Sequence, residues 1–218
     1  MQPSQWEVVI LKPTKVFLSF LASQIGEENL PDFKTLQTDK TAYVIRKQDN
    51  DEATLDEIES HFVTMFRHEI QRWLGDEACN EIEASFLDFL CCFKFELHSQ
   101  IVLMESSIKE GKHLLRIKPR SVLLKWMQSA VENDGELSDV LERVELSHLA
   151  ENATVVIKNF ADLREIKPFL KYYYMPVFET EMSRMCDNSE QWPVVDSFDK
   201  FNRYFAIEVH TQLIHLHH

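Results

Sequence analysis

Two pairs of residues in this chain have the types and spacing for acid–base chemistry or metal binding. Each pair is a glutamate followed two positions later by a histidine, Glu96 with His98 and Glu208 with His210. Residues two apart on a strand point to the same face of a sheet, so each pair could hold a divalent metal or act as acid and base. A metal-dependent hydrolase that uses these four residues is therefore one hypothesis for the chain.

The same four residues also have a simpler interpretation. On the exposed face of an amphipathic strand they would be ordinary solvated side chains, or cross-strand partners of each other if the two strands are adjacent. We favour this interpretation, because a catalytic or metal cluster needs several converging groups and spacing alone does not bring them together. Three histidines near the C-terminus could add ligands, but a frayed chain end is the simpler expectation for them. These are His215, His217 and His218.

Other catalytic signatures are incomplete. His68-Glu69 begins like the zinc-protease helix motif, but Arg72 stands where the second histidine is needed, so we predict a solvated helix face. The four glycines are isolated, which excludes glycine-rich phosphate loops and the dinucleotide fingerprint. The four cysteines form neither a C-x-x-C pair nor a disulfide framework, so reduced structural thiols are expected at Cys79, Cys91, Cys92 and Cys186. We therefore expect a non-catalytic protein without a cofactor.

The Glu and His pairs lie in a segment that occurs twice. Residues 85–103 (SFLDFLCCFKFELHSQIVL) and 197–215 (SFDKFNRYFAIEVHTQLIH) share seven identical residues at one offset of 112 (208 − 96). Unrelated windows of this length would share roughly one identity, so the match indicates an internal duplication. The first turns are predicted to be helical. The rest alternates with a period of two, which predicts one strand from Phe93 to Leu103.

Further matched segments extend the repeat. Strands are predicted at 6–11 and 42–46, and a long amphipathic helix at about 54–74 ends before Gly75. The second half repeats this plan, with an added acidic helix at about 136–149. In the second half, the helix that corresponds to the long helix contains Pro176, and this proline should break or kink the helix. We therefore predict an α/β (or α+β) fold of two tandem units, 1–111 and 112–218, each strand-helix-strand-helix-strand, in a pseudo-two-fold arrangement.

Composition limits the classes of partner. The chain has 218 residues, 44% of them hydrophobic, which is enough to bury a core. A formal charge of −13 argues against nucleic acid or an anionic membrane as the main partner, because phosphate binding needs Lys and Arg. No secretory signal and no long apolar span are evident, so we expect a cytoplasmic protein that does not insert into a membrane.

Aromatic residues supply the candidate binding site. Three consecutive tyrosines cannot all face one core, so at least one ring should be displayed, and interfaces favour tyrosine. The predicted partner-binding residues are Tyr172, Tyr173, Tyr174, Met175 and Trp192. The acidic charge would steer a protein partner that presents a basic or amphipathic segment.

These features favour an adaptor or chaperone-like protein that binds another polypeptide. In size and charge the chain is similar to bacterial secretion chaperones and secretion-system adaptors, and this similarity implies a secretion-system adaptor or effector chaperone. Two alternatives remain open. One is the metal-dependent hydrolase with the Glu/His site, and the other is an immunity or inhibitor protein that blocks a basic partner with an acidic surface.

Overall fold

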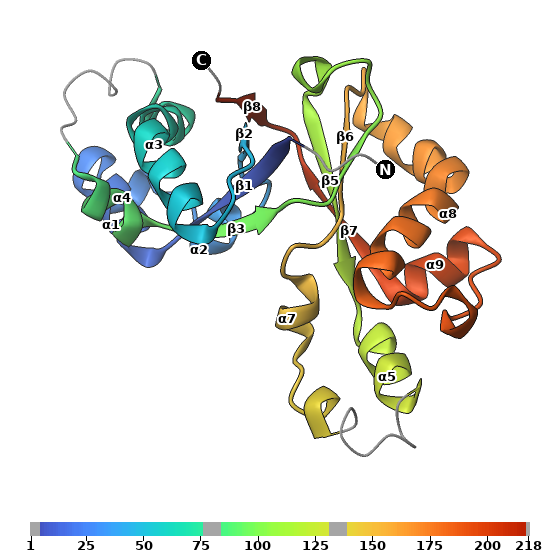
Figure 1. Ribbon diagram of the computed structural model, residues 1–218. Helices are drawn as coiled ribbons and strands as arrows, with labels where there is room; N and C mark the ends of the chain where they lie inside the picture. The colour runs from blue at the N-terminus through green and yellow to red at the C-terminus, as the bar shows by residue number, and fades with distance from the viewer. Residues whose placement is uncertain (1–4, 76–83, 131–138, 217–218) are drawn as a thin grey trace. The chain divides into compact units, whose positions relative to one another are not determined.

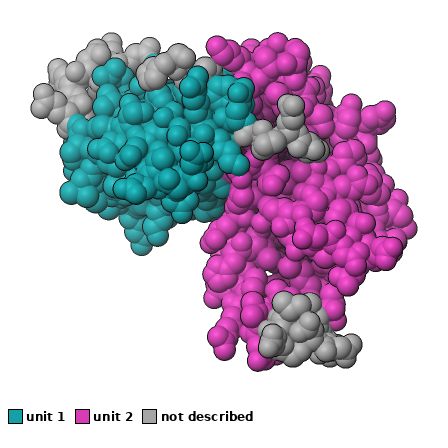
Figure 2. Space-filling view, viewed as in Figure 1, with its two compact units in different colours: residues 1–97, 211–218 teal, residues 98–210 magenta. Residues whose placement is uncertain are grey.

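The computed structural model describes residues 5–75, 84–130 and 139–216, and these form two compact units. Unit 1 comprises residues 1–97 and 211–218, and unit 2 comprises residues 98–210 (Figure 2). This division differs from the predicted repeat boundary between 111 and 112. The difference arises because the end of each sequence repeat joins the sheet that is built mainly from the other repeat.

Unit 1 contains one four-stranded mixed sheet and its helices (Figure 1). Its strands, in sheet order, are β3 (Phe93–His98), β1 (Trp6–Pro13), β2 (Ala42–Arg46) and β8 (Leu213–His215). Strand β1 is antiparallel to β2, and β8 is parallel to β2. Its helices are α1 (Lys15–Ile25), η1 (Glu27–Asn29), α2 (Phe33–Leu36), α3 (Asp51–Leu74) and α4 (Phe86–Cys92).

Unit 2 contains a second four-stranded mixed sheet. Its strands, in sheet order, are β4 (Ile101–Leu103), β6 (Val155–Lys158), β5 (His113–Pro119) and β7 (Phe205–His210). Strand β5 is antiparallel to both β6 and β7, and β4 is parallel to β6. Its helices are η3 (Ile108–Glu110), α5 (Ser121–Ala130), α7 (Leu146–Ala150), η4 (Leu163–Glu165), α8 (Ile166–Met185), η5 (Ser189–Gln191) and α9 (Phe198–Tyr204).

The two sheets have the same strand order when matched segments are compared. In this match, β1, β2, β3 and β8 of unit 1 correspond in turn to β5, β6, β7 and β4 of unit 2. The order β3-β1-β2-β8 then becomes β7-β5-β6-β4, which is the strand order of unit 2. Glu96 on β3 and Glu208 on β7 thus occupy corresponding places. The predicted α+β class is confirmed, while the origin of the two units by duplication stays a prediction.

The predicted strand from Phe93 to Leu103 is in fact two strands in two sheets. β3 ends at His98 beside β1, whereas β4 begins at Ile101 beside β6. Ser99 and Gln100 connect them, and the backbone N–H of Ser99 donates to Oδ1 of Asn152 at 2.6 Å. The period-two pattern continues across this break because each sheet buries one of its faces.

Local signals in the sequence explain where the long helix α3 begins and ends. Asn50 caps it by accepting a hydrogen bond from the backbone N–H of Ala53, so α3 starts three residues before the predicted Thr54. Asp51 and Glu52 in the first turn complement the helix dipole. Gly75 follows the last residue with φ of 81°, in the region that favours glycine.

Each unit has its own hydrophobic core. In unit 1 the core joins β1 and β2 to α1, α3 and α4, and Phe17 and Phe93 lie in contact there with ring centroids 4.6 Å apart. In unit 2 the core joins β5 and β6 to α8 and α9, and includes Phe178 and Phe205. Among the described residues, no helix has the length and apolar character needed to span a bilayer.

In unit 2 the structure contradicts the predicted acidic helix and the predicted break at Pro176. The acidic stretch 136–149 is not one helix: its described part has a turn at 142–143, and α7 starts only at Leu146. Residues 136–138 lie outside the described part. Helix α8 is not broken at Pro176 but continues to Met185. After the proline, the carbonyl of Pro176 accepts a hydrogen bond from Oγ1 of Thr180 at 2.8 Å.

Candidate functional site

Helix α8 displays part of the predicted aromatic site. Tyr172 is 78% exposed, and its ring meets that of Tyr173 edge-on with centroids 4.7 Å apart. Tyr173 is half-buried and also contacts Phe169, with ring centroids 4.8 Å apart. Phe169 in turn touches the buried Phe160. A chain of rings therefore runs from the interior of unit 2 to its surface, which holds the exposed ring on a rigid support.

The other three predicted residues serve the fold. Tyr174 packs against the rings of α9, and Met175 lies against the same core. Trp192 donates from Nε1 to the carbonyl of Cys186 at 2.9 Å and meets Phe178 edge-on. Tyr172 is therefore the one exposed residue of the five, and the other four are half-buried.

Exposed prolines and lysines surround Tyr172. Pro168 and Pro176 lie four residues before and after it, on the same side of the helix, and both are exposed. Lys167 and Lys171 are also exposed, and within the described residues neither forms an ion pair. We call the surface formed by Pro168, Phe169, Tyr172, Tyr173 and Pro176 the aromatic face of α8.

Two lysines flank the aromatic face. Lys167 and Lys171 lie close to Tyr172 in the sequence, in a chain of net charge −13. Exposed acidic residues instead gather at the start of α3 in unit 1: Asp49, Asp51, Glu52, Asp56 and Glu59. Unit 2 exposes acidic residues as well, for example Glu165, Glu179 and Glu190, so the acidic surface is not confined to unit 1.

Both carboxylates of the hypothetical Glu/His metal site form ion pairs with a residue of a neighbouring strand. Glu96 forms a cross-strand ion pair with Lys12 of β1. Glu208 pairs with Arg116 of β5, directly opposite it, at 3.1 Å. Each glutamate therefore pairs across its own sheet, while the two repeated strands, β3 and β7, lie in different sheets and are not partners of each other.

The histidines of these pairs are not solvated, contrary to the simpler interpretation. His98 and His210 are fully buried, and Nδ1 of His98 donates to the carbonyl of Ala153 at 2.8 Å. His215 lies in β8, so it is not part of a frayed end. His217 and His218 lie outside the described residues. In the described part of the chain, no three His, Cys, Asp or Glu side chains are grouped to hold a metal ion.

The His68-Glu69 pair is not on a solvated face, because Glu69 is only 4% exposed. The hydroxyl of Tyr43 donates to Oε1 of Glu69 at 2.9 Å and lies 3.3 Å from Nδ1 of His68. Burial raises the pKa of Glu69, against the opposing effects of Thr41, Tyr43 and Arg72. Burial also lowers the pKa of His68, and nearby Arg72 adds to this effect. The arrangement is a buried polar network beneath α3.

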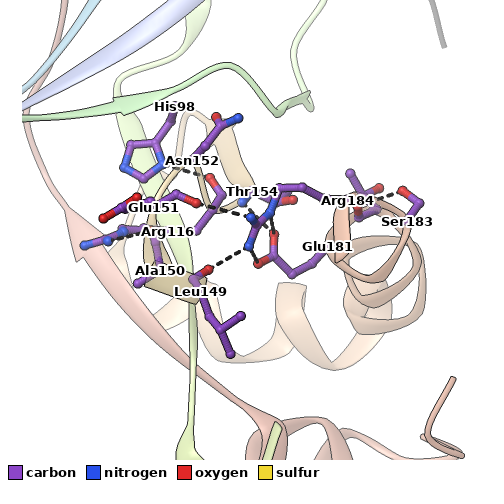
Figure 3. A network of polar contacts seen from close by, with 12 residues as sticks. His98, Arg116, Leu149, Ala150, Glu151, Asn152, Thr154, Glu181, Ser183 and Arg184 are labelled. Atoms are coloured by element: carbon purple, nitrogen blue, oxygen red, sulfur yellow. Dashed lines mark hydrogen bonds and ion pairs between the residues drawn. The ribbon is translucent and has the colours of Figure 1, made fainter. Parts of the chain in front are cut away.

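A corresponding network lies in unit 2 (Figure 3). Glu181 on α8 is fully buried and accepts from the backbone N–H of Thr154 at 2.7 Å and from Nη2 of Arg184 at 2.7 Å. Arg184 also donates to the carbonyls of Leu149 at 2.7 Å and Glu151 at 3.2 Å. The long helix thereby fixes the loop that leads into β6.

In unit 1, Arg72 performs the same task. Its Nη2 donates to the carbonyl of Asp39 at 2.7 Å, and its Nη1 donates to Oγ1 of Thr41 at 3.1 Å. Glu69 and Arg72 are separated from Glu181 and Arg184 by 112 residues in each case (181 − 69, 184 − 72). This is the offset of the repeated segment.

Each of the loops held in this way contains a residue with positive φ, three positions before the strand that follows. Asp39 has φ of 51° and Asn152 has φ of 49°. Their side chains accept hydrogen bonds from the residue that precedes β8 or β4: Thr211 for Asp39 and Ser99 for Asn152. Asp and Asn adopt this conformation more readily than other non-glycine residues. Sequence reasoning missed this arrangement, although the repeated Glu-x-x-Arg spacing was a usable signal.

The cysteines in the described part of the chain differ in exposure. Cys91 is exposed and Cys92 is buried, and burial is the main cause that raises the pKa of Cys92 to about 11. Cys186 is half-buried beside the carbonyl of Asn188. Cys79 lies outside the described residues.

Comparison of the chain with family models, with curated proteins and with solved structures finds no match. A functional argument therefore depends on the geometry of the two units.

Proposed function

We propose that this protein is a polypeptide-binding protein of the adaptor or chaperone class, and that the aromatic face of α8 is where it contacts its partner. The observation that carries the proposal is the 78% exposure of Tyr172 above a supporting chain of rings. Tyrosine is enriched at binding surfaces because its ring is large and rigid and its hydroxyl can hydrogen-bond.

The neighbours of Tyr172 narrow the kind of partner. Apolar side chains of the partner would lie against Tyr172, Tyr173 and Pro176, while Lys167 and Lys171 would meet acidic side chains. An amphipathic segment that carries acidic residues fits this surface better than a basic one. Basic segments would instead be attracted to the acidic start of α3 in unit 1.

Affinity capture from the native host tests the proposal. The wild-type chain is compared with Tyr172→Ser and with a matched control, Val194→Ser, which removes an equally exposed apolar side chain (77%) from the same unit. We expect a protein that both the wild type and the control retain, and whose recovery falls about tenfold or more with Tyr172→Ser, as truncation of a central interface tyrosine costs about 2 kcal/mol.

Two further measurements make the result decisive. Both variants should melt at the wild-type temperature, because neither side chain is buried. The retained protein, once purified, should bind more weakly to Lys171→Glu than to the wild type. Equal recovery of all proteins by the wild type and Tyr172→Ser would contradict the proposed site.

A further inference from the structure

Two six-residue segments occupy equivalent positions in the two sheets. Residues 211–216 (TQLIHL) run beside β2 in unit 1, and residues 99–104 (SQIVLM) run beside β6 in unit 2. Both have the pattern Ser/Thr-Gln-apolar-apolar-x-apolar. We call each receiving surface a strand cradle, formed in unit 1 by Asp39 and β2 and in unit 2 by Asn152 and β6.

The polar contacts of the two segments match one by one. At the first position, the N–H of Thr211 donates to Oδ1 of Asp39 at 2.7 Å and its hydroxyl to Oδ2 at 2.5 Å. Ser99 makes the equivalent bonds to Oδ1 of Asn152, at 2.6 and 3.0 Å. The first hydroxyl residue is therefore recognised in both cradles by the same geometry.

Backbone pairing also matches. The carbonyl of Gln212 accepts from the N–H of Ala42 at 3.0 Å, and the carbonyl of Gln100 accepts from the N–H of Val155 at 2.9 Å. At the last position, Leu216 donates to the carbonyl of Val44 at 2.9 Å. Its counterpart Met104 donates to the carbonyl of Ile157 at 3.0 Å. Each segment is thus held in parallel at both ends of its strand.

The fourth and sixth positions pack against the hydrophobic cores, and Leu213 at the third position of the unit 1 segment is also buried. Ile214 and Leu216 pack against the core of unit 1, and Leu216 is 6% exposed. Val102 and Met104 pack against the core of unit 2. The fifth position differs in type, His215 in one segment and Leu103 in the other, so it contributes least to the shared pattern.

We propose that the cradle of unit 1 is a peptide-binding site of the β-augmentation class, whose ligand is an extended segment of another polypeptide with the pattern Ser/Thr-Gln-apolar-apolar-x-apolar. In this structure the protein's own residues 211–216 occupy it. The two segments differ in sequence but make matched contacts, each in its own cradle, and what they share is the six-residue pattern. Strand β8 pairs with β2 over only three residues, so few hydrogen bonds are lost when a segment of another polypeptide replaces it.

The test uses the whole chain with its own segment weakened. Ile214→Asp combined with Leu216→Asp removes both inward apolar side chains, so the segment should leave the cradle. Fluorescence anisotropy then measures binding of labelled peptides TQLIHL and SQIVLM. We expect both to bind the weakened variant at least tenfold more tightly than the wild type, whose cradle is occupied.

Matched peptides and a cradle variant test the recognition itself. TQLIDL, changed at the fifth position, should bind like TQLIHL, whereas TQLDHL, changed at the fourth, should not bind. Asp39→Ala in the weakened variant should reduce the affinity about tenfold or more, because two hydrogen bonds to the first residue are lost.

Two results would overturn the proposal. The first is a weakened variant that keeps its wild-type circular dichroism but binds neither peptide. The second is equal binding of TQLIHL and TQLDHL. If the double variant unfolds, Leu216→Ala serves in its place, and the same peptides must then raise its melting temperature while TQLDHL must not.

Discussion

Removal of the Arg184 guanidinium should destabilise unit 2 strongly. In Arg184→Met, Glu181 keeps its hydrogen bond from Thr154 but loses its ion pair, and the carbonyls of Leu149 and Glu151 lose a donor. Glu181 is fully buried and the Arg184 side chain is only 16% exposed, so solvent does not replace the lost contacts. Breaking a buried pair by removing one partner costs about 3–5 kcal/mol.

This cost can be converted into a melting temperature. Unit 2 has 113 residues (210 − 98 + 1). At an unfolding entropy of about 2.1 cal/mol/K per residue, 1 kcal/mol shifts its melting temperature by about 4 °C. Scanning calorimetry should therefore show the transition of unit 2 lowered by about 12–20 °C in Arg184→Met. The transition of unit 1 should stay near its wild-type temperature.

An exposed pair in the same unit provides the control. Arg164 pairs with Asp162 but its side chain is 90% exposed, so Arg164→Met should leave the melting temperature unchanged within error. The double variant Glu181→Leu/Arg184→Met removes both buried charges and should lose less stability than Arg184→Met alone. Equal melting temperatures for Arg184→Met and Arg164→Met would refute the reasoning.

Two further predictions concern unit 1. Burial raises the pKa of Glu69 above 4.5, so the folded state favours the protonated carboxyl group. The stability that this preference contributes is fully present below pH 4.5 and is lost as the pH rises through the raised pKa. Urea unfolding at several pH values should show Glu69→Gln gaining stability relative to the wild type as the pH increases from 4 to 8, and a constant difference would contradict this. Iodoacetamide should modify the exposed Cys91 in the native protein well before the buried Cys92, whose pKa is raised to about 11; peptide mass mapping checks this order, and equal rates would count against it.

The aromatic residues show how far composition could predict the candidate site. Three consecutive tyrosines predicted that one ring would be displayed, and Tyr172 is. The sequence did not predict that Trp192 would be fixed by a hydrogen bond to the carbonyl of Cys186. Nor did the net charge of −13 predict a local excess of lysines around Tyr172, because net charge is a sum over the chain and says nothing of its distribution.

Local structure was determined by the sequence itself. Helix α3 follows from its apolar period, its Asn50 cap and its Gly75 stop, and these signals act over a few residues. The strand 42–46 was predicted with the bounds of β2, because its residues form a short run between polar segments.

Only the tertiary structure decided which strand joins which sheet. The alternation from Phe93 to Leu103 specifies a buried face, but either sheet offers one, so the sequence does not show that β3 and β4 separate. The bond that directs β8 to β2 joins Thr211 to Asp39, 172 residues away in the chain. Contacts between such distant residues depend on the whole fold, and for that reason the strand cradles became visible only in three dimensions.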